Sequence, residues 1–203
     1  TSGSLAEYVS VTCNVFRDTL SRAVFAQIQF PPRATAIMPV IGKDVLFLID
    51  VSGSITNRDI DDVRREIVRA LTSLTPGDSF NIVLFSVVQK RLYESFQPIN
   101  SSRIQEAYAF ISRLEGSRET NIHEALMKTT PFLKKSNRIT NIVFMSDAKP
   151  TEGTQNFKQI INDFSRNRVG NVTFLGFDIG RARNQFLLDY LAYENRGSAY
   201  HKH

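Results

Sequence analysis

Apolar residues along this chain fall into two patterns that alternate with each other. Short continuous apolar runs cover 45–49, 80–88, 139–145 and 172–177. Runs of this length predict strands that are buried on both faces of a sheet. The stretches between them repeat apolar residues every three or four positions, most clearly at Ile60, Val63, Ile67, Leu71 and Leu74. That spacing predicts amphipathic helices.

Further helices are predicted over 102–114, 120–129, 157–164 and 182–195. Two short extended segments, 89–93 and 198–201, are predicted to be an edge hairpin and a closing strand. Strands that alternate with helices predict an α/β fold, namely a doubly wound, Rossmann-like, mostly parallel central sheet with helices on both faces. In such a sheet, ligands bind at the carboxyl ends of the strands.

The first forty residues follow a different pattern. Segments 6–16 and 23–30 are rich in Val, Phe and Tyr and are joined by a polar turn, and Pro31 and Pro32 stop the second segment. This pattern predicts a β-hairpin, which is marginally stable alone in water. The predicted organisation is therefore an N-terminal hairpin extension at 1–40 and one α/β domain at 41–203.

Composition narrows the range of functions. The 203 residues carry a net charge of +5, and the Lys and Arg residues are scattered along the chain. Without a basic stripe or a known module we expect no nucleic-acid binding. No apolar run approaches the roughly 20 residues that span a bilayer, so we expect no membrane insertion in this segment. The single cysteine, Cys13, excludes an internal disulfide and a thiolate cluster, and its alternating surroundings predict a small buried residue.

The strand at 45–49 runs directly into a group of oxygen-bearing side chains. Asp50 ends the strand, and Ser52 and Ser54 follow on either side of a glycine. A carboxylate followed by two hydroxyls on a turn is typical of half of a site for a hard cation. Two alternatives remain for these residues taken singly: Asp50 as a helix N-cap beside a glycine turn, and Ser52 and Ser54 as capping residues.

The second half of the predicted site comes from distant positions. Thr120 stands where a helix opens, and Asp147 ends the strand at 139–145. Together, Asp50, Ser52, Ser54, Thr120 and Asp147 offer five oxygen donors with two negative charges. This set suits Mg²⁺, with Mn²⁺ or Ca²⁺ as alternatives. A cation that its ligands neutralise only partly attracts a further carboxylate, which predicts a protein partner presenting Asp or Glu.

The motif Asp50-x-Ser52-x-Ser54, the distant Thr120 and the later Asp147 resemble the metal-ion-dependent adhesion site of von Willebrand factor A domains. The resemblance covers about residues 40 to 203. Within that family, the segments PGDSFNIVLFS, TNIHEAL and LAYENRGSAY are similar to the heavy chains of inter-alpha-trypsin inhibitor. The resemblance implies a non-enzymatic adhesion module in an extracellular or secreted protein, with extracellular matrix components among its partners.

The sequence departs from the family pattern in two places. Arg118 and Glu119 stand where family members often have Gly-Gly before the liganding threonine, and Ala148 replaces a common glycine after the second aspartate. Glu119 is either exposed or a further acceptor beside the ligands, and we favour the exposed position. These changes affect the preference for a ligand more than the binding of a metal.

Two other classes of function compete with adhesion. Phosphotransfer enzymes of the haloacid dehalogenase type also have an aspartate that ends a parallel strand and binds Mg²⁺. Those enzymes need a second aspartate two residues after the first, and Ser52 occupies that position here. The third class is a structural A domain inside an intracellular assembly.

Overall fold

The structure is a computed structural model that describes residues 9–17, 19–20, 22–31, 41–112, 119–133, 138–180 and 184–201. The chain divides into two compact units, Thr1–Val40 and Ile41–His203. None of the helices in these described ranges has the length and apolarity needed to cross a bilayer.

The smaller unit is a β-hairpin. Strand β1 (Thr12–Arg17) pairs antiparallel with β2 (Val24–Gln29), from Thr12 opposite Gln29 to Arg17 opposite Val24. Every residue of both strands is exposed. Cys13 is therefore exposed, and the prediction of a buried cysteine is wrong.

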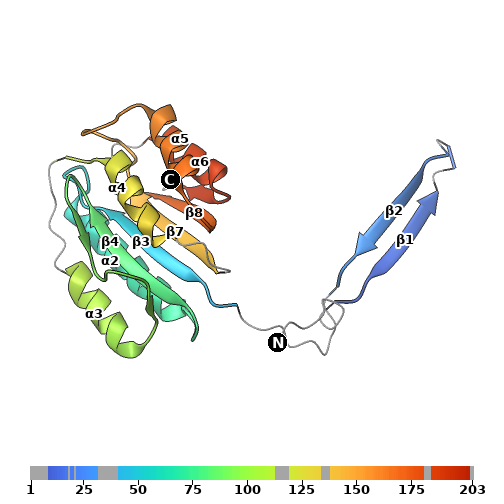
Figure 1. Cartoon of the computed structure of the whole chain (residues 1–203), viewed down its shortest axis with the longest axis horizontal. Coiled ribbons are helices and arrows are strands. Elements are labelled where there is room, and N and C mark those ends of the chain that lie inside the picture. Colours follow the sequence, from blue (N-terminus) through green and yellow to red (C-terminus); the bar gives the residue numbers. More distant parts are fainter. Residues whose placement is uncertain are drawn as a thin grey trace. The chain divides into compact units, whose positions relative to one another are not determined.

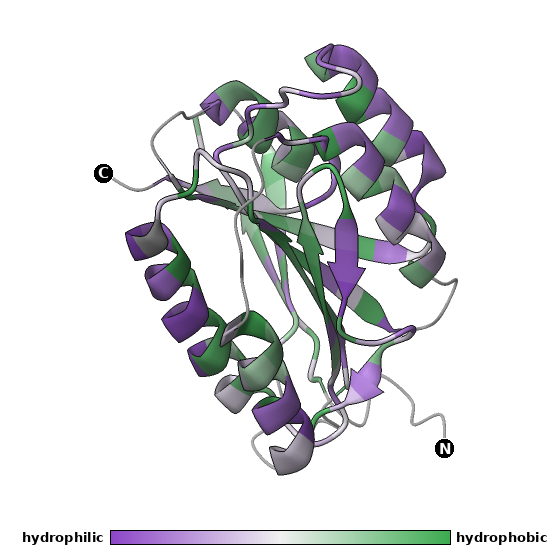
Figure 2. Ribbon diagram, turned by 90° about the vertical axis from the view of Figure 1, so that its left-hand side faces the viewer, coloured by the Kyte–Doolittle hydropathy of each residue, from purple (hydrophilic) through white to green (hydrophobic). Residues whose placement is uncertain are grey.

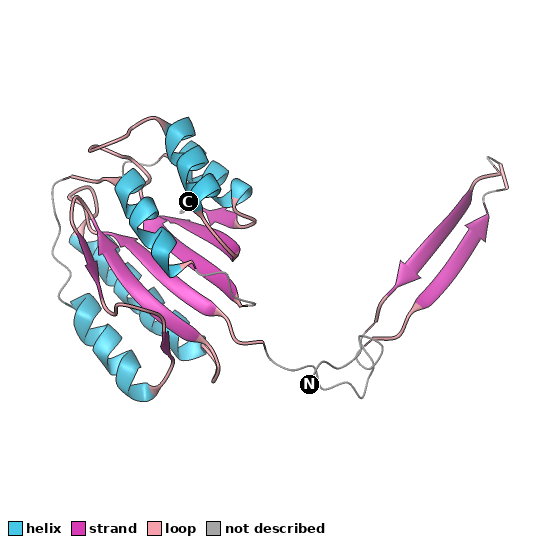
Figure 3. Cartoon of the chain, viewed as in Figure 1, coloured by secondary structure: helices cyan, strands magenta, loops and turns pink. Residues whose placement is uncertain are grey.

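The larger unit is built on a sheet with the strand order β5-β4-β3-β7-β8-β9, and a further short strand, β6, pairs with β4 (Figures 1 and 3). Strands β4, β3, β7, β8 and β9 run parallel to one another, whereas β5 and β6 are antiparallel to β4. The strands are β3 (Asp44–Asp50), β4 (Ser79–Phe85), β5 (Gln89–Arg91), β6 (Gln97–Pro98), β7 (Ile139–Ser146), β8 (Asn171–Asp178) and β9 (Ser198–Tyr200).

Helices lie on both faces of this sheet (Figures 1 and 2). One face packs against α4 (Ile122–Thr129), α5 (Phe157–Asn167) and α6 (Gln185–Glu194), and the other against α2 (Asn57–Ser73) and α3 (Ser101–Ser112). Alternate residues of β3 serve the two layers, with Leu46 and Leu48 on the first face and Phe47 and Ile49 on the second. A short 3₁₀ helix, η1 (Thr130–Phe132), follows α4. The predicted α/β, doubly wound and mostly parallel architecture is confirmed.

Two details differ from the predicted elements. Strand β4 ends at Phe85 rather than at residue 88, because the chain turns there with Ser86 N donating to the carbonyl of Val88 at 3.2 Å and returns as β5. Strands β7 and β8 are not buried on both faces. Their residues alternate between buried and more exposed positions for most of their length, because α2 and α3 cover mainly the β3 and β4 half of their face.

Candidate metal centre

Asp50 and Asp147 end the neighbouring parallel strands β3 and β7 in the same way. The Oδ1 atom of Asp50 accepts a hydrogen bond from Ser52 N at 2.9 Å, and the Oδ1 atom of Asp147 accepts one from Lys149 N at 3.1 Å. Each aspartate thus closes a turn with the amide two residues ahead, as Asp commonly does at the end of a strand. Because both strands run in the same direction, both turns lie at one edge of the sheet.

The second oxygens of the two carboxylates differ. Asp50 Oδ2 accepts a 2.6 Å hydrogen bond from the Ser146 hydroxyl. Asp147 Oδ2 is buried and has no hydrogen-bond partner among the residues that the structure describes. A buried carboxylate oxygen left in this state is costly unless a cation or a donor reaches it.

Ser52 and Ser54 place two hydroxyls beside these carboxylates. Their Oγ atoms lie 3.1 Å apart, and the Ser54 hydroxyl is close enough to Asp147 to favour the charged form of that carboxylate. Neither serine caps the following helix, because α2 begins at Asn57 and its N-cap is Thr56. The capping alternative for the two serines is therefore wrong.

Thr120 is buried in the loop before α4, whose N-cap is Asn121 rather than Thr120. Its amide donates to Thr151 Oγ1 at 2.9 Å, and its carbonyl accepts from Thr151 N and Glu152 N at 3.0 and 3.1 Å. The contacts described for Thr120 thus join it to the loop after Asp147, while the other four predicted residues contact or interact with one another more directly.

Sequence reasoning missed two residues at this edge. Ser146 Oγ donates to Asp50 and accepts from Ala148 N at 2.9 Å, so this side chain ties the end of β7 to the end of β3. Asp178 ends β8 in register with Ser146 and adds a third buried carboxylate at the same edge. The signal for Asp178 was present, since it follows an apolar strand just as Asp50 and Asp147 do.

The electrostatics of the edge disfavour the charged carboxylates. Burial raises the pKa of Asp50 to about 6, against the lowering effect of the hydrogen bonds from Ser146 and Ser52, and the charge of Asp147 adds to the rise. Burial also raises the pKa of Asp147, opposed by Ser54 and Lys149 and reinforced by the charge of Asp178. Nearby positive charge would lower these pKa values and stabilise the ionised pair.

The turn after β8 approaches the first loop closely. Gly180 has a φ of +84°, and a Cβ atom there would lie 2.9 Å from Ile55 Cδ1 and 3.6 Å from Asp147 Cβ. A Cβ atom there would crowd the end of the Ile55 side chain, and the positive φ would strain any residue that has one. Glycine therefore suits this turn, where the chain passes close to Ile55 and Asp147.

Comparison with known proteins identifies the fold and the family. The sequence profile of the von Willebrand factor type A domain matches residues 43–201. The chain belongs to the von Willebrand factor type A family. Among solved structures, a von Willebrand factor type A protein from Catenulispora acidiphila superposes with a TM-score of 0.67 at 15% identity, covering 89% of this chain and 41% of that one. The ArnB paralog from Sulfolobus acidocaldarius superposes with a TM-score of 0.65 at 23% identity, covering 96% and 51%.

The chain is also similar to named proteins. It is 29% identical over 182 residues to human inter-alpha-trypsin inhibitor heavy chain H4, in an alignment that covers 84% of this chain and 19% of that protein. It is 30% identical over 172 residues to heavy chain H3 of Bos taurus, covering 80% and 19%. The chain thus spans about a fifth of the length of these relatives. The predicted resemblance to the A domains of the heavy chains is confirmed.

The departures from the family pattern have structural consequences. Glu119 is exposed, as we favoured, and Arg118 lies outside the described residues. Ala148 is buried and has a φ of +54°, in the left-handed region that glycine adopts without strain. The A domain therefore keeps the backbone shape of the common glycine while adding a buried methyl group.

The donors at this edge fit a divalent cation. The described residues contain no cluster of three or more His, Cys, Asp or Glu side chains that would hold a metal by themselves, so other oxygen donors, such as hydroxyls, would contribute to any coordination. Hydroxyl oxygens and a buried carboxylate oxygen without a hydrogen bond are hard donors, and hard cations such as Mg²⁺ bind them in preference to softer metals.

Proposed function

We propose that the A domain at 41–203 is a divalent-cation-dependent protein-binding module and that residues 1–40 form a hairpin extension to it. The observation that carries the proposal is the pair of buried carboxylates, Asp50 and Asp147. Both have raised pKa values, and Asp147 Oδ2 lacks a hydrogen bond among the described residues. These features destabilise the edge unless positive charge is supplied, and an adhesion function gives a reason to retain them.

Each of the five proposed ligands has a distinct part. Asp147 offers its Oδ2 atom, and Asp50, whose two oxygens accept hydrogen bonds from Ser52 N and Ser146 Oγ, contributes negative charge. Ser52, Ser54 and Thr120 offer neutral oxygens from two loops. When bound, a divalent ion such as Mg²⁺, with Mn²⁺ or Ca²⁺ as alternatives, would supply an electrophilic centre for one more oxygen ligand.

The proposed partner is a protein that presents an Asp or Glu side chain. Five protein ligands would leave one position of an octahedral ion open, and a carboxylate oxygen of a partner is a hard ligand that would fill it. Lys149 is exposed next to Asp147. Its ammonium group would be a second positive charge, beside the cation, for the carboxylate of the partner. By resemblance to the heavy chains, we place this recognition outside the cell and include extracellular matrix components among the partners.

A binding function is favoured over phosphotransfer. Ser52 stands where the phosphatase mechanism needs an aspartate for proton transfer. Its backbone N–H donates a hydrogen bond to Asp50. Among the described histidines, His123 Nε2 lies 2.9 Å from Asp163, and His201 lies between Asp189, 2.8 Å from its Nε2, and Asp178, 3.5 Å from its Nδ1. We therefore propose that the domain is not an enzyme.

Calorimetry of Mg²⁺ and Mn²⁺ binding tests the proposal. The wild-type chain should bind one ion, Asp147→Asn and Asp50→Ala should lose binding by at least about a hundredfold, and Asp61→Asn, which alters an exposed carboxylate on α2, should bind like wild type. Equal binding by wild type and Asp50→Ala would refute the proposed site. A glutamate-bearing peptide that binds in Mg²⁺ and is released by chelation would support the partner chemistry.

A further inference from the structure

Two short motifs in this chain match the acceptor pattern for N-linked glycans, which is Asn-x-Ser or Asn-x-Thr with x other than Pro. They are Asn100-Ser101-Ser102 and Asn171-Val172-Thr173. Because the pattern is short, the fold has to show whether the asparagine amide is presented to solvent. The two motifs differ in this respect, since a described hydrogen bond fixes the amide of Asn100 and none fixes that of Asn171.

Asn100 caps helix α3. Its Oδ1 atom accepts a hydrogen bond from Arg103 N at 2.9 Å, and its carbonyl accepts one from Ile104 N at 3.0 Å. Because the Arg103 amide is a donor, the side-chain atom that faces it is the oxygen of Asn100. The other amide atom, Nδ2, has no hydrogen bond to a described residue, and Asn100 is exposed. The cap thus holds the oxygen against the helix and leaves the nitrogen accessible.

We propose that Asn100 is an acceptor site for an N-linked glycan, in the extracellular setting on which the proposed function also rests. In this reaction Nδ2 forms a bond to the anomeric carbon of an oligosaccharide carried on a lipid diphosphate. The bond between that carbon and the diphosphate oxygen breaks, the lipid diphosphate leaves with the electron pair, and the amide nitrogen loses one proton to solvent. No atom is oxidised or reduced. Oδ1 is retained, so the modified side chain still caps α3.

The acceptor lies at the edge of the sheet opposite the candidate metal centre. Asn100 follows β6, which pairs with the first residues of β4, and Ile99 N donates to the carbonyl of Asp78 at 3.0 Å. The carboxylates of the metal centre stand at the carboxyl ends of β3 and β7, which run parallel to β4. The 7 residues of β4 extend about 20 Å at the rise of a parallel strand. A glycan at Asn100 therefore leaves the metal edge open to a partner.

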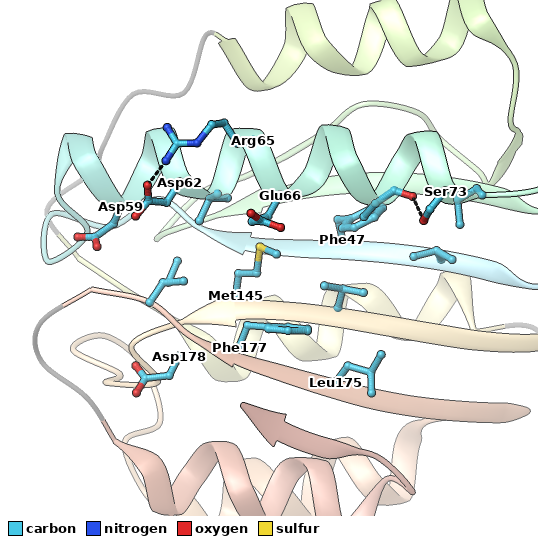
Figure 4. A pocket seen from close by; sticks show the side chains of 16 residues that line it. Phe47, Asp59, Asp62, Arg65, Glu66, Ser73, Met145, Leu175, Phe177 and Asp178 are labelled. Atoms are coloured by element: carbon cyan, nitrogen blue, oxygen red, sulfur yellow. Dashed lines mark hydrogen bonds and ion pairs between the residues drawn. The ribbon is translucent and has the colours of Figure 1, made fainter. Parts of the chain in front are cut away.

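Asn100 is also absent from the lining of the hollow of about 500 Å³ between α2 and the sheet. Figure 4 shows Phe47, Met145 and Phe177 among the side chains that line this hollow. A hydrophilic glycan at Asn100 thus starts neither at the metal edge nor on this apolar surface. It starts beside the first turn of α3, where Ser101 and Ser102 are exposed.

Secretion of the full 203-residue chain from an animal cell line tests the proposal, with a cleavable secretion signal and with Asn171→Gln so that one acceptor motif remains. Most of the secreted molecules should carry one glycan. Release by peptide N-glycosidase in heavy-oxygen water should leave a labelled aspartate at position 100 in peptide mass spectra. Ser102→Ala removes the hydroxyl of the motif and Asn100→Asp removes the amide nitrogen, so each should abolish the glycan. The matched control Ser101→Ala, at the middle position of the motif, should keep it.

Thermal melts test the orientation of the amide. In chains produced in bacterial cytoplasm, without the glycan, Asn100→Asp should melt close to wild type, because Asp is also a good N-cap. Asn100→Ala lacks the acceptor for Arg103 N and should melt at a lower temperature. The secreted chain should melt no lower with its glycan than after enzymatic release, and its Mg²⁺ affinity should be the same in both forms. This proposal and the metal-dependent function therefore fail separately.

Several results would overturn the proposal. An unmodified Asn100 in the secreted, folded chain removes the acceptor site, and a glycan that persists in Asn100→Asp places the modification elsewhere. A melting temperature that rises when the glycan is released means that the fold does not accommodate it. Equal melting of Asn100→Ala and wild type removes the cap that orients the amide. A change in Mg²⁺ affinity on release contradicts the placement of the glycan at the opposite edge.

Discussion

Asp78 and Asp50 are two fully buried aspartates at opposite ends of the same parallel sheet, and their surroundings have opposite effects. Asp78 precedes β4 and accepts hydrogen bonds from both the amide and the ammonium of Lys43 and from both the amide and the hydroxyl of Thr75, at 2.8 to 3.0 Å. Burial raises its pKa, but these four donors lower it far more, and the result is well below the ordinary value. Asp50 is equally inaccessible to solvent, but burial raises its pKa to about 6, because its donors, from Ser146 and Ser52, are neutral and do not offset the loss of solvation.

The difference separates structure from function better than burial does. Asp78 is fully satisfied by its own chain and fixes the start of β3 to the turn before β4. Both oxygens of Asp50 accept hydrogen bonds, but only from neutral donors, and Asp147 Oδ2 has no hydrogen-bond partner among the described residues. Both carboxylates lie where loops from three parallel strands meet. A buried carboxylic acid with a raised pKa indicates a site where a cation or a further donor would stabilise the charged form. A buried carboxylic acid with a lowered pKa indicates hydrogen bonds and ion pairs that stabilise the fold.

The largest predicted effect is the loss of the structural tie. Asp78→Asn replaces one acceptor oxygen with an NH₂ group that faces the donors of Lys43 and Thr75. We expect the free energy of unfolding to fall by about 2–4 kcal/mol in urea titrations at pH 7, with Mg²⁺ affinity of the folded protein unchanged. The exposed variant Asp61→Asn should change stability by less than about 0.5 kcal/mol. A stability like that of wild type would show that Asp78 is not the tie described above.

The same substitution at Asp50 should change the free energy of unfolding in the opposite direction. Asp50→Asn removes a charge that burial disfavours, so the metal-free protein should become more stable at pH 7 by about 1–3 kcal/mol. Metal-dependent stabilisation should vanish in the same variant. Thermal melts without Mg²⁺ and with Mg²⁺ at about 5 mM measure both effects. Destabilisation of the metal-free Asp50→Asn protein would contradict the comparison.

The two aspartates should also give opposite pH slopes. The raised pKa of Asp50 contributes stability below its ordinary value of 3.8, and this contribution is lost as the pH rises through about 6. The lowered pKa of Asp78 contributes stability above 3.8, and this contribution is lost as the pH falls. In metal-free buffer, Asp50→Asn should therefore flatten the decline between about pH 4 and 6, and Asp78→Asn should flatten the loss on acidification.

A smaller effect is expected for the hydroxyl that joins the two strand ends. Ser146→Ala removes the donor to Asp50 Oδ2 and the acceptor of Ala148 N, so both loops lose a fixed position. We expect Mg²⁺ affinity in calorimetry to fall by about tenfold. Ser102→Ala, on the exposed side of α3, serves as the matched control. Unchanged affinity in Ser146→Ala would mean that this hydroxyl does not position the proposed ligands.

Much of the architecture was predictable because it depends on patterns that are local in the sequence. The apolar run at 45–49 and the helical stripe from Ile60 to Leu74 led to β3 and α2 with small errors at their ends. The predicted β4 was too long. Val87 and Val88 continue the apolar run in the sequence, but in the structure they lie in the turn after the strand. No local pattern distinguishes an apolar residue in a strand from one in a tight turn beside it.

What the sequence left out depends on contacts between distant segments. The exposed face of β7 and β8 follows from which strands α2 and α3 cover, and the residues of those strands are as apolar as the buried ones. The bond from Ser146 to Asp50 joins positions 96 apart in the chain. By contrast, the five proposed ligands follow a spaced motif, which is why they were predictable as a set while their metal binding stays a prediction.

The smallest predicted effect concerns the alanine that replaces a common glycine. Ala148→Gly relieves left-handed strain of about 1–2 kcal/mol, loses the burial of one methyl group at about 0.8 kcal/mol, and adds freedom to the unfolded chain. These terms nearly cancel, so stability should change by less than about 1 kcal/mol and Mg²⁺ affinity by less than about twofold, because the amide still donates to Ser146.

Arg196 provides the comparison that isolates the methyl group, since it also has a left-handed φ, +60°, but is exposed. Arg196→Gly should be more stable than Arg196→Ala by about 0.5–1 kcal/mol in urea titrations, because no buried methyl offsets the relief of strain. If glycine is instead equally favourable at both positions, the Ala148 methyl contributes nothing to the packing around the metal edge. A large drop in Mg²⁺ affinity in Ala148→Gly would assign that methyl to the site rather than to the stability of its loop.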